Sequence, residues 1–266
     1  MLWGPVGLLL STPLTICLLV LGTHVPKLQF LRVLLGDEPA LAPYQQIYRR
    51  LIRGAVVDAA AVARKEIEDK GLERGLDDSL GRMMVLADRD TALHRLNAAQ
   101  TATIVDGTDE VLDLLAESIG EEPAPDEAAD AAAVAPGVLF HCVGGRGEVD
   151  DAAAAVIAFA LRQRGLRAED SRRAEPIEGS RQKGAVLLVA CYCSHPSQAV
   201  LRYNKRKLQA DAGPTRHVVI DYEVAPMADL AAKVGLAGDL IAGDIEAISR
   251  FMLQQSAAAA AGATAA

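Results

Sequence analysis

The chain is short of aromatic residues, of cysteine and of positive charge. Only 4% of its 266 residues are aromatic, and the formal net charge is -8. An acidic chain has no basic face with which to neutralise phosphates, which argues against nucleic-acid binding. The four cysteines lie inside apolar runs, which does not indicate a secreted disulfide framework and favours a reducing, cytosolic environment. These cysteines are Cys17, Cys142, Cys191 and Cys193.

Charge is entirely missing from the first 26 residues, since no Asp, Glu, Lys or Arg precedes Lys27. A membrane helix needs about 20 apolar residues, and Val6 to Gly22 nearly supplies them, with Trp3 at one interface. Pro13 predicts a kink in that helix. A signal peptide would have a basic start and a small-residue cleavage site, and neither is present. A buried helix of a soluble protein is the other alternative.

Positive residues follow this segment, at Lys27, Arg32 and in the cluster from Arg49 to Arg53. The positive-inside rule therefore places the rest of the chain in the cytoplasm, below the cell inner membrane. Four leucines at helical spacing predict an amphipathic helix at the membrane surface, so that residues 1–36 form the membrane part. The alternative is that this face docks on the helices that follow. The leucines are Leu28, Leu31, Leu34 and Leu35.

Two short motifs, Gly4-Pro5-x-Gly7 and Pro13-Leu14-Thr15, resemble the last membrane helix of the autoinducer-2 exporter family (PerM-type permeases). The following HVPKLQFLRVLLGDEPALAP resembles the tail of long bacterial members, so the resemblance covers roughly the first 45 residues. It implies membrane transport by the parent family. In that family several membrane helices precede this one, and a transport pathway needs helices to line it. We therefore expect a truncated product, a fragment or one subunit of a split permease, which does not transport alone.

Residues 41–118 predict a small antiparallel helical bundle, because short amphipathic helices follow one another with short loops. The predicted helices are Tyr44–Arg53, Val57–Lys70, Gly75–Ala87 and Asp90–Glu117. Asp77 and Asp90 are predicted N-terminal caps. His94, with Asp88 and Asp90 nearby, lacks the spacing of a metal site, so we expect a surface or packing role. The Pro-, Ala- and acid-rich residues 119–136 predict a linker, and residues 256–266 a disordered tail.

Residues 137–255 alternate apolar strands with helices, which indicates a parallel sheet covered on both faces. The predicted strands are Gly137–Val143, Leu166–Asp170, Ala185–Tyr192, His217–Tyr222 and Asp239–Ala242. The predicted helices are Asp150–Arg164, Pro196–Ala210, Met227–Val234 and Ile245–Gln254, the last capped by Asp244. The fold class is therefore α/β, a flavodoxin-like doubly wound sheet of strand order 2-1-3-4-5 after a membrane helix and a bundle.

Ligands of such sheets bind beyond the carboxyl ends of the strands. The predicted ligand-binding residues at this edge are Gly144, Gly145, Arg146, Gly147, Ser194, His195 and Asp221. The Gly-rich turn lacks G-x-G-x-x-G, and the acids Glu148 and Asp150 oppose a phosphate, so nucleotide binding is not expected.

The order of bundle, linker and sheet, over residues 44 to 255, resembles the cobalamin-binding module of methionine synthase and corrinoid proteins. In that family Asp-x-His-x-x-Gly after the first strand supplies the lower cobalt ligand. Here the same place reads Gly144-Gly145-Arg146-Gly147-Glu148, and His141 lies within the predicted strand. Cobalamin binding through a histidine is therefore not expected, no cofactor is predicted, and binding without that ligand stays open.

A zinc or redox site at Cys191-x-Cys193-x-His195, with Cys142 on a neighbouring strand, is an alternative for the same edge, because residues two apart on a strand share one face. Zinc pairs are usually spaced C-x₂₋₄-C, so buried core cysteines are the preferred interpretation. We therefore predict no metal ligand and no catalytic residue.

Together these features predict a membrane-tethered regulatory or ligand-sensing region of an exporter-like permease that is not an enzyme. The alternative is a cobalamin-like or other small-molecule-binding sensor module, and an enzyme that uses Cys193 and His195 ranks third. The expected partners are the lipid bilayer, other permease helices or a second copy of the chain, and an unknown small molecule.

Overall fold

A computed structural model describes residues 41–119, 138–172, 186–212, 215–222, 228–236 and 238–264. Contacts along the chain divide it into Met1–Ala42 and a second compact unit, Pro43–Ala266. Within the described ranges no helix combines the length and the apolar character needed to cross a membrane. The predicted membrane segment, residues 1–36, and nearly all of the predicted linker lie outside the described residues.

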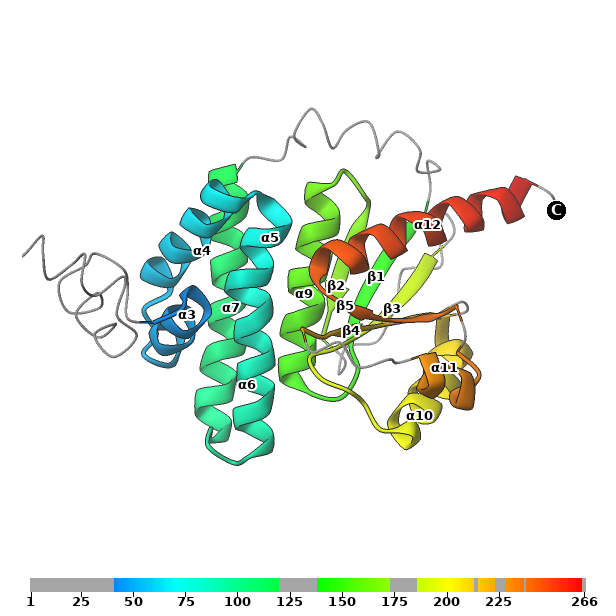
Figure 1. Cartoon of the computed structure of the whole chain (residues 1–266), viewed down its shortest axis with the longest axis horizontal. Helices are drawn as coiled ribbons and strands as arrows, with labels where there is room; N and C mark the ends of the chain where they lie inside the picture. The colour runs from blue at the N-terminus through cyan, green and yellow to red at the C-terminus, as the bar shows by residue number, and fades with distance from the viewer. Residues whose placement is uncertain are drawn as a thin grey trace, which may run out of the picture. The chain divides into compact units, whose positions relative to one another are not determined.

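The first part of the second unit is all helical, as predicted (Figure 1). Its elements are α3 (Pro43–Ile52), α4 (Val56–Lys70), α5 (Leu72–Leu76), the π-helical turn η2 (Asp77–Gly81), α6 (Arg82–Ala92) and α7 (Ala98–Ile119). The bounds of α3 and α4 differ from the prediction by no more than one residue at either end. Gly54 and Gly71, which follow these helices, have positive φ angles, and this conformation is typical of helix ends.

The predicted break between Ala87 and Asp90 is wrong, because α6 continues to Ala92. The chain instead turns at His94, whose φ is 53°. Asn97 then starts α7 with a reciprocal cap: its Oδ1 accepts from the Gln100 amide at 2.8 Å, and Gln100 Oε1 accepts from the Asn97 amide at 3.0 Å. Asp90 and Asp77 therefore lie inside helical segments and do not cap them.

A five-stranded parallel sheet follows, in the order β2-β1-β3-β4-β5, so the predicted 2-1-3-4-5 order is confirmed. The strands are β1 (Leu139–Gly144), β2 (Ala168–Ser171), β3 (Val186–Tyr192), β4 (Thr215–Ile220) and β5 (Leu240–Gly243). The helices between and after them are α9 (Glu148–Gln163), α10 (Gln198–Ala212), α11 (Ala228–Val234) and α12 (Ile245–Thr264). The described residues thus form an α/β fold of the flavodoxin-like type.

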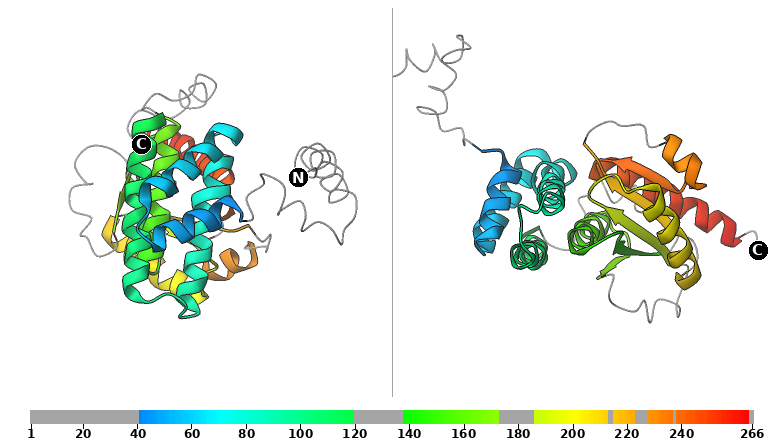
Figure 2. Two further views of the ribbon diagram at one scale, coloured as in Figure 1. Left: turned by 90° about the vertical axis from the view of Figure 1, so that its left-hand side faces the viewer. Right: turned by 90° about the horizontal axis from the view of Figure 1, so that it is seen from below.

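Alternate residues of β3 point to opposite faces of the sheet and belong to two separate cores. Val189 and Cys191 belong to the core that includes α9 and α12, whereas Leu188, Ala190 and Tyr192 belong to the one beneath α10 and α11. Both faces are covered, which explains why the strand is apolar throughout. Figures 1 and 2 show α9 between the sheet and the helices of the bundle.

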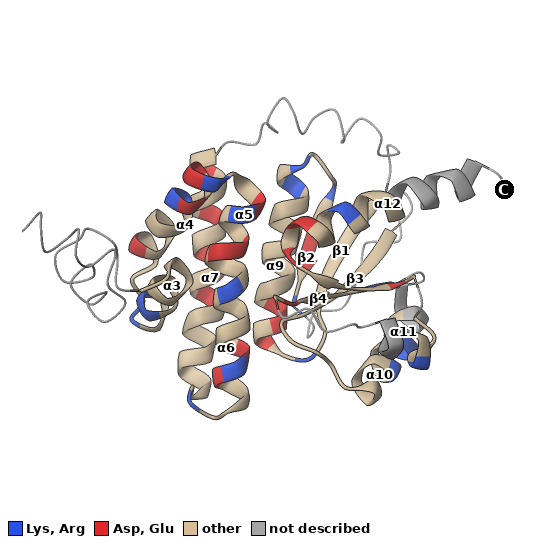
Figure 3. Cartoon of the chain, in the orientation of Figure 1, with Lys and Arg blue, Asp and Glu red and all other residues tan. Residues whose placement is uncertain are grey.

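Helix α9 packs against both the bundle and the sheet. Acidic residues open it at Glu148, Asp150 and Asp151, where they favour the helix N-terminus, and the acidic colour at its start is visible in Figure 3. Alanine fills most of its middle, and the small side chains let neighbours approach from both sides. Its residues are buried almost all round, in one core cluster with residues of the bundle, such as Ile47 and Leu115, and of the sheet, such as Phe140.

Helix α12 begins at the predicted cap, where Asp244 Oδ1 accepts from the Ala247 amide at 2.8 Å. It then extends to Thr264. Most of the predicted disordered tail is therefore helical in the structure, which the high helix propensity of the alanine run explains.

Candidate functional site

The carboxyl ends of the parallel strands meet at one edge of the sheet, here called the carboxyl edge. Gly144 ends β1, and the turn Gly145-Arg146-Gly147 leads into α9. Ser194 and His195 follow β3, and Asp221 follows β4. The topology therefore brings all the residues that the sequence predicted for ligand binding to the same edge.

Arg146 is the centre of a polar group here called the Arg146 cluster. Its Nε and Nη2 donate to both carboxylate oxygens of Asp150, at 2.9 and 3.0 Å, and its Nη1 donates to Ser194 Oγ at 3.0 Å. Nη2 also donates to Asp88 Oδ2 of α6 at 3.2 Å, and the same oxygen accepts from Ser194 Oγ at 2.6 Å. The cluster thus ties the bundle to the turns after β1 and β3.

Asp150 is the buried member of the cluster. Its side chain is only 1% exposed, compared with 29% for Arg146 and 19% for Asp88. Asp150 also accepts a hydrogen bond from the Cys193 amide at 2.8 Å, which anchors the turn after β3. Burial by itself would lower the pKa of Arg146, but the hydrogen bonds and charge of Asp150, with the charge of Asp88, outweigh it and raise the pKa. The guanidinium is therefore a fixed cation beside two carboxylates.

His195 and Asp221 form a second polar group at the carboxyl edge. His195 Nε2 lies 2.6 Å from Asp221 Oδ2 and joins the turn after β3 to the turn after β4. The His195 side chain is 40% exposed, whereas that of Asp221 is 13% exposed. The hydrogen bond to the Asp221 carboxylate fixes the orientation of the His195 imidazole, which is partly exposed to solvent. This pair is the exposed part of the edge.

The Gly-rich turn is explained by close packing. A Cβ on Gly145 would lie 2.0 Å from Tyr192 Cε1, and one on Gly144 would lie 2.5 Å from the Asp151 amide nitrogen. Asn204 Nδ2 donates to the Gly145 carbonyl and to Tyr192 Oη at 3.0 Å. Both glycines are therefore required by the protein's own contacts and give no indication of a phosphate cradle.

A buried polar chain continues behind this turn. Tyr192 Oη lies 3.2 Å from His217 Nδ1, and the two rings stack with centroids 6.1 Å apart. Burial, with Lys205 and Arg216 nearby, lowers the pKa of His217 to about 4, which keeps its imidazole neutral at ordinary pH. Asn204 and His217 were not predicted, because their role depends on contacts between α10 and two strands.

The cysteines do not converge with His195. Cys142, Cys191 and Cys193 are free and buried. Cys193 Sγ points to the Val149 carbonyl, and burial followed by the charge of Asp150 raises the pKa of this thiol. β3 ends at Tyr192, so the alternation that would align His195 with the thiols stops before it. No group of potential metal ligands occurs in the part of the chain that the structure describes.

The other histidines considered from the sequence belong to neither polar group at the carboxyl edge. His141 is 8% exposed on β1, and its Nε2 lies 2.8 Å from Ser171 Oγ on β2. His94 is exposed in the turn after α6. The two aspartates near it in the sequence have other partners: Asp90 accepts a hydrogen bond from Tyr48 Oη at 2.8 Å, and Asp88 belongs to the Arg146 cluster.

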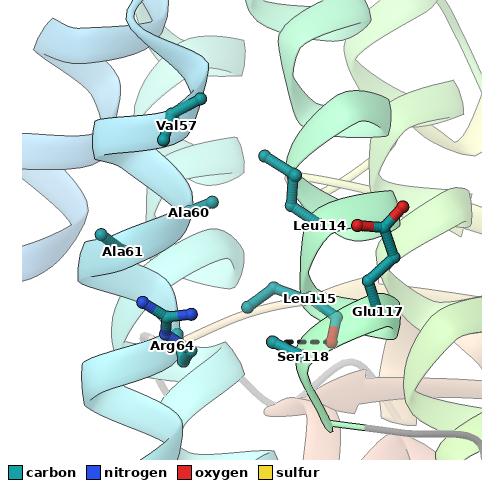
Figure 4. Close-up of a pocket in the computed structure, with 8 residues that line it drawn as sticks. All are labelled: Val57, Ala60, Ala61, Arg64, Leu114, Leu115, Glu117 and Ser118. Carbon is teal, nitrogen blue, oxygen red and sulfur yellow. Dashed lines mark hydrogen bonds between the residues drawn. The ribbon is translucent and has the colours of Figure 1, made fainter.

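A groove of about 330 Å³ lies elsewhere, between α4 and α7 (Figure 4). Val57, Ala60, Ala61 and Arg64 line one side, and Leu114, Leu115, Glu117 and Ser118 line the other. Val57 is 73% exposed. None of the lining residues belongs to the carboxyl edge, and nothing in the structure shows what would cover this groove.

No protein-family model matches the chain, and no curated protein matches it. Among solved structures, it is similar to the monomethylamine corrinoid protein of Methanosarcina barkeri, with a TM-score of 0.45 and 12% sequence identity. That likeness covers 80% of this chain and 97% of the other. The architecture is therefore established by the strand order and packing described above, and not by this likeness.

The resemblance of the first 45 residues to the autoinducer-2 exporter family gains no support from these comparisons. The membrane helix on which it rests lies outside the described residues. Membrane attachment therefore stays a prediction from the sequence.

Proposed function

We propose that the described residues form a small-molecule-binding sensor module whose ligand docks at the carboxyl edge. The observation that carries this proposal is the Arg146 cluster, in which one guanidinium holds Asp88 of the bundle together with Asp150 and Ser194 of the sheet. A ligand that contacts this cluster exchanges hydrogen bonds with both parts of the unit. Its binding energy can therefore bias how firmly the bundle holds the sheet.

The charges favour one chemical class of ligand. Arg146 is matched by two carboxylates, and Asp221 and the start of α9 add further negative charge at the same edge. An anionic ligand would have to displace Asp88 or Asp150 from the guanidinium. A neutral or positively charged molecule rich in N–H or O–H donors can instead bond to the carboxylates, Ser194 and His195.

A corrinoid is a specific candidate within this class, because its periphery carries neutral amide groups. The residues present do not fit the histidine-ligated mode of binding. The turn after β1 carries Arg146, which is already bonded to Asp150, and His141 is buried against β2. A corrinoid bound here would have no cobalt ligand from that turn.

Binding to the purified full chain tests the proposal. Equilibrium dialysis and visible spectroscopy with hydroxocobalamin test the corrinoid directly. A thermal-shift panel of neutral, cationic and anionic metabolites tests the wider class, and we expect stabilisation by members of the first two groups. Ser194→Ala and His195→Asn should weaken the binding.

His94→Asn is the matched control, because His94 is also exposed and lies in the turn after α6, outside both the Arg146 cluster and the His195–Asp221 pair. The proposal is overturned if no compound stabilises the chain, or if binding is insensitive to Ser194→Ala and His195→Asn.

We further propose, from the sequence alone, that residues 1–36 tether this module to the cytoplasmic face of the inner membrane. Flotation of the full chain with lipid vesicles, compared with a variant that lacks residues 1–36, tests the tether. Flotation of both, or of neither, would contradict it.

A further inference from the structure

A second polar junction between the bundle and the sheet is centred on Asp77. This residue lies in the π-helical turn η2 and is only 7% exposed. Its Oδ1 accepts from Tyr222 Oη at 2.7 Å and from the Ile245 amide at 2.9 Å. Tyr222 follows β4, and Ile245 is the first residue of α12, after β5. One carboxylate of the bundle therefore holds the ends of two neighbouring strands.

The bundle is shaped to receive Tyr222. A Cβ on Gly81, in the same turn as Asp77, would lie 2.1 Å from Tyr222 Oη, so only glycine leaves room for this contact. The guanidinium of Arg82 lies 4.5 Å from the centre of the Tyr222 ring and adds a cation–π contact. The turn η2 therefore supplies the hydrogen-bond acceptor, Asp77, and the space at Gly81, and the next residue, Arg82, supplies the cation. A π-helical turn inside an α-helix is frequently a functional feature.

The groups around Asp77 set its proton affinity. Burial raises the pKa of Asp77 to about 6, although the hydrogen bonds from Ile245 and Tyr222 oppose this change. The negative charges of Asp244, before α12, and Asp78, in η2, also contribute to this increase. Arg82 of α6 is the cation that lies over the Tyr222 ring. Asp77 therefore changes charge within an ordinary pH range.

This junction is one residue away from the proposed ligand site. Tyr222 follows Asp221 directly, and Asp221 holds His195 at 2.6 Å. A carboxylate that anchors Tyr222 also restricts the backbone that carries Asp221. Loss of its charge weakens the hydrogen bonds it accepts, because a charge-assisted bond is about twice as strong as a neutral one.

We infer that Asp77 is a proton-responsive positioning residue: its charged form fixes the turn after β4, and its protonation loosens the His195–Asp221 pair and lowers ligand affinity at the carboxyl edge. The effect on affinity rests on the proposed function, whereas the effect on the turn does not.

NMR of the full chain tests the effect on the turn. The carboxyl carbon of Asp77 is followed between pH 5 and pH 8, with the amides of Ile245, Asp221 and Tyr222. We expect all four signals to share one midpoint near pH 6, and the three amides to lose this transition in Asp77→Asn. Asp78→Asn is the matched control, because its side chain lies in the same turn but is exposed and bonded to Lys70 and Arg82; it should retain the transition.

The His195 ring contacts Asp221 directly, so the experiment is repeated in His195→Asn. The inference is overturned if Asp221 and Tyr222 stop following Asp77 in that background, or if they still titrate together in Asp77→Asn.

A ligand found in the thermal-shift panel provides the second readout. Its Kd should be about fivefold weaker at pH 5.5 than at pH 7.5 in the natural chain, and the ratio should be close to one in Asp77→Asn. If no ligand is found, the proposed function fails while the NMR result still decides the role of Asp77. If a ligand binds but the Asp77 transition is absent, this inference fails alone.

Discussion

The bundle is joined to the sheet by two polar junctions that differ in their chemistry. The Arg146 cluster combines one cation with two carboxylates, is partly exposed and can exchange its hydrogen bonds with a ligand. The Asp77 junction has a single buried carboxylate, which accepts hydrogen bonds from a phenol and a backbone amide. Because a partly exposed charge cluster and a buried lone carboxylate respond to different perturbations, we expect the first junction to respond to a ligand and the second to a proton.

Of the substitutions that test this difference between the junctions, Arg146→Met should have the largest effect on stability. Asp150 is almost fully buried and would lose its cation, and breaking such a pair typically costs about 3–5 kcal/mol. We expect a loss near 3 kcal/mol in the free energy of unfolding, because Asp150 keeps its bond from the Cys193 amide. Urea unfolding measures this loss. The double variant Arg146→Met, Asp150→Asn should recover part of it, and no recovery would contradict the pairing.

Asp77→Ala should have the next largest effect, and one that depends on pH. The pKa of Asp77 is about 6 in the folded chain, above its ordinary value of 3.8, so the fold binds this proton more tightly and gains stability as pH falls through 6. Between pH 8 and pH 5 the gain is about 1 kcal/mol.

Asp77→Ala removes this gain and leaves the buried donors of Ile245 and Tyr222 without their acceptor. We therefore expect a loss of about 2 kcal/mol at pH 5 and a smaller one at pH 8. Urea unfolding at both pH values measures the difference, and an equal loss at both would contradict the assignment. Asp78→Asn serves as the control: it removes one of the charges that raise the pKa of Asp77, so the pH dependence should persist with its midpoint at a lower pH.

Asp88→Asn sharpens the comparison, because it weakens the bundle side of the Arg146 cluster without removing the buried pair. Asp88 is partly exposed, and exposed charge pairs contribute about 0–1 kcal/mol. We expect a loss below about 1 kcal/mol, which should shrink further in high salt. A loss as large as that of Arg146→Met would show that Asp88, and not Asp150, is the principal partner of the guanidinium.

His195→Asn should have the smallest effect on stability. Its side chain is 40% exposed, and exposed substitutions usually change the free energy of unfolding by less than about 0.5 kcal/mol. Thermal and urea unfolding should therefore match those of the natural chain, while ligand binding at the edge weakens. A large loss of stability would show that the His195–Asp221 pair is structural.

The sequence predicts the sheet well because each strand is a compact apolar run with a helix after it. Val186–Tyr192 is the clearest case, and its position at the centre of the order follows from the rules for parallel sheets. The same rules bring Arg146, Ser194 and His195 to one edge. Local patterns such as these need no knowledge of distant contacts.

The sequence was less informative where contacts between distant residues determine the role of a side chain. Asp77 looks like a helix cap in the sequence, but its partners lie more than 140 residues away, at Tyr222 and Ile245. Asp88 was considered with His94 because they are near in sequence, whereas its partner is Arg146. Gly144 and Gly145 were predicted as ligand-binding residues, which stays a prediction, and only the positions of Asp151 and Tyr192 show that both glycines are also required for packing.

The alanine-rich helix α9, buried between bundle and sheet, has a consequence for how this unit can be divided. A cut between residues 119 and 138 would give two fragments, each with an apolar surface that fits the other. Neither half is therefore a good candidate for transfer to another protein by itself. Expressed together as separate chains, the two halves should assemble through this surface, and their reassembly would report its integrity without any ligand.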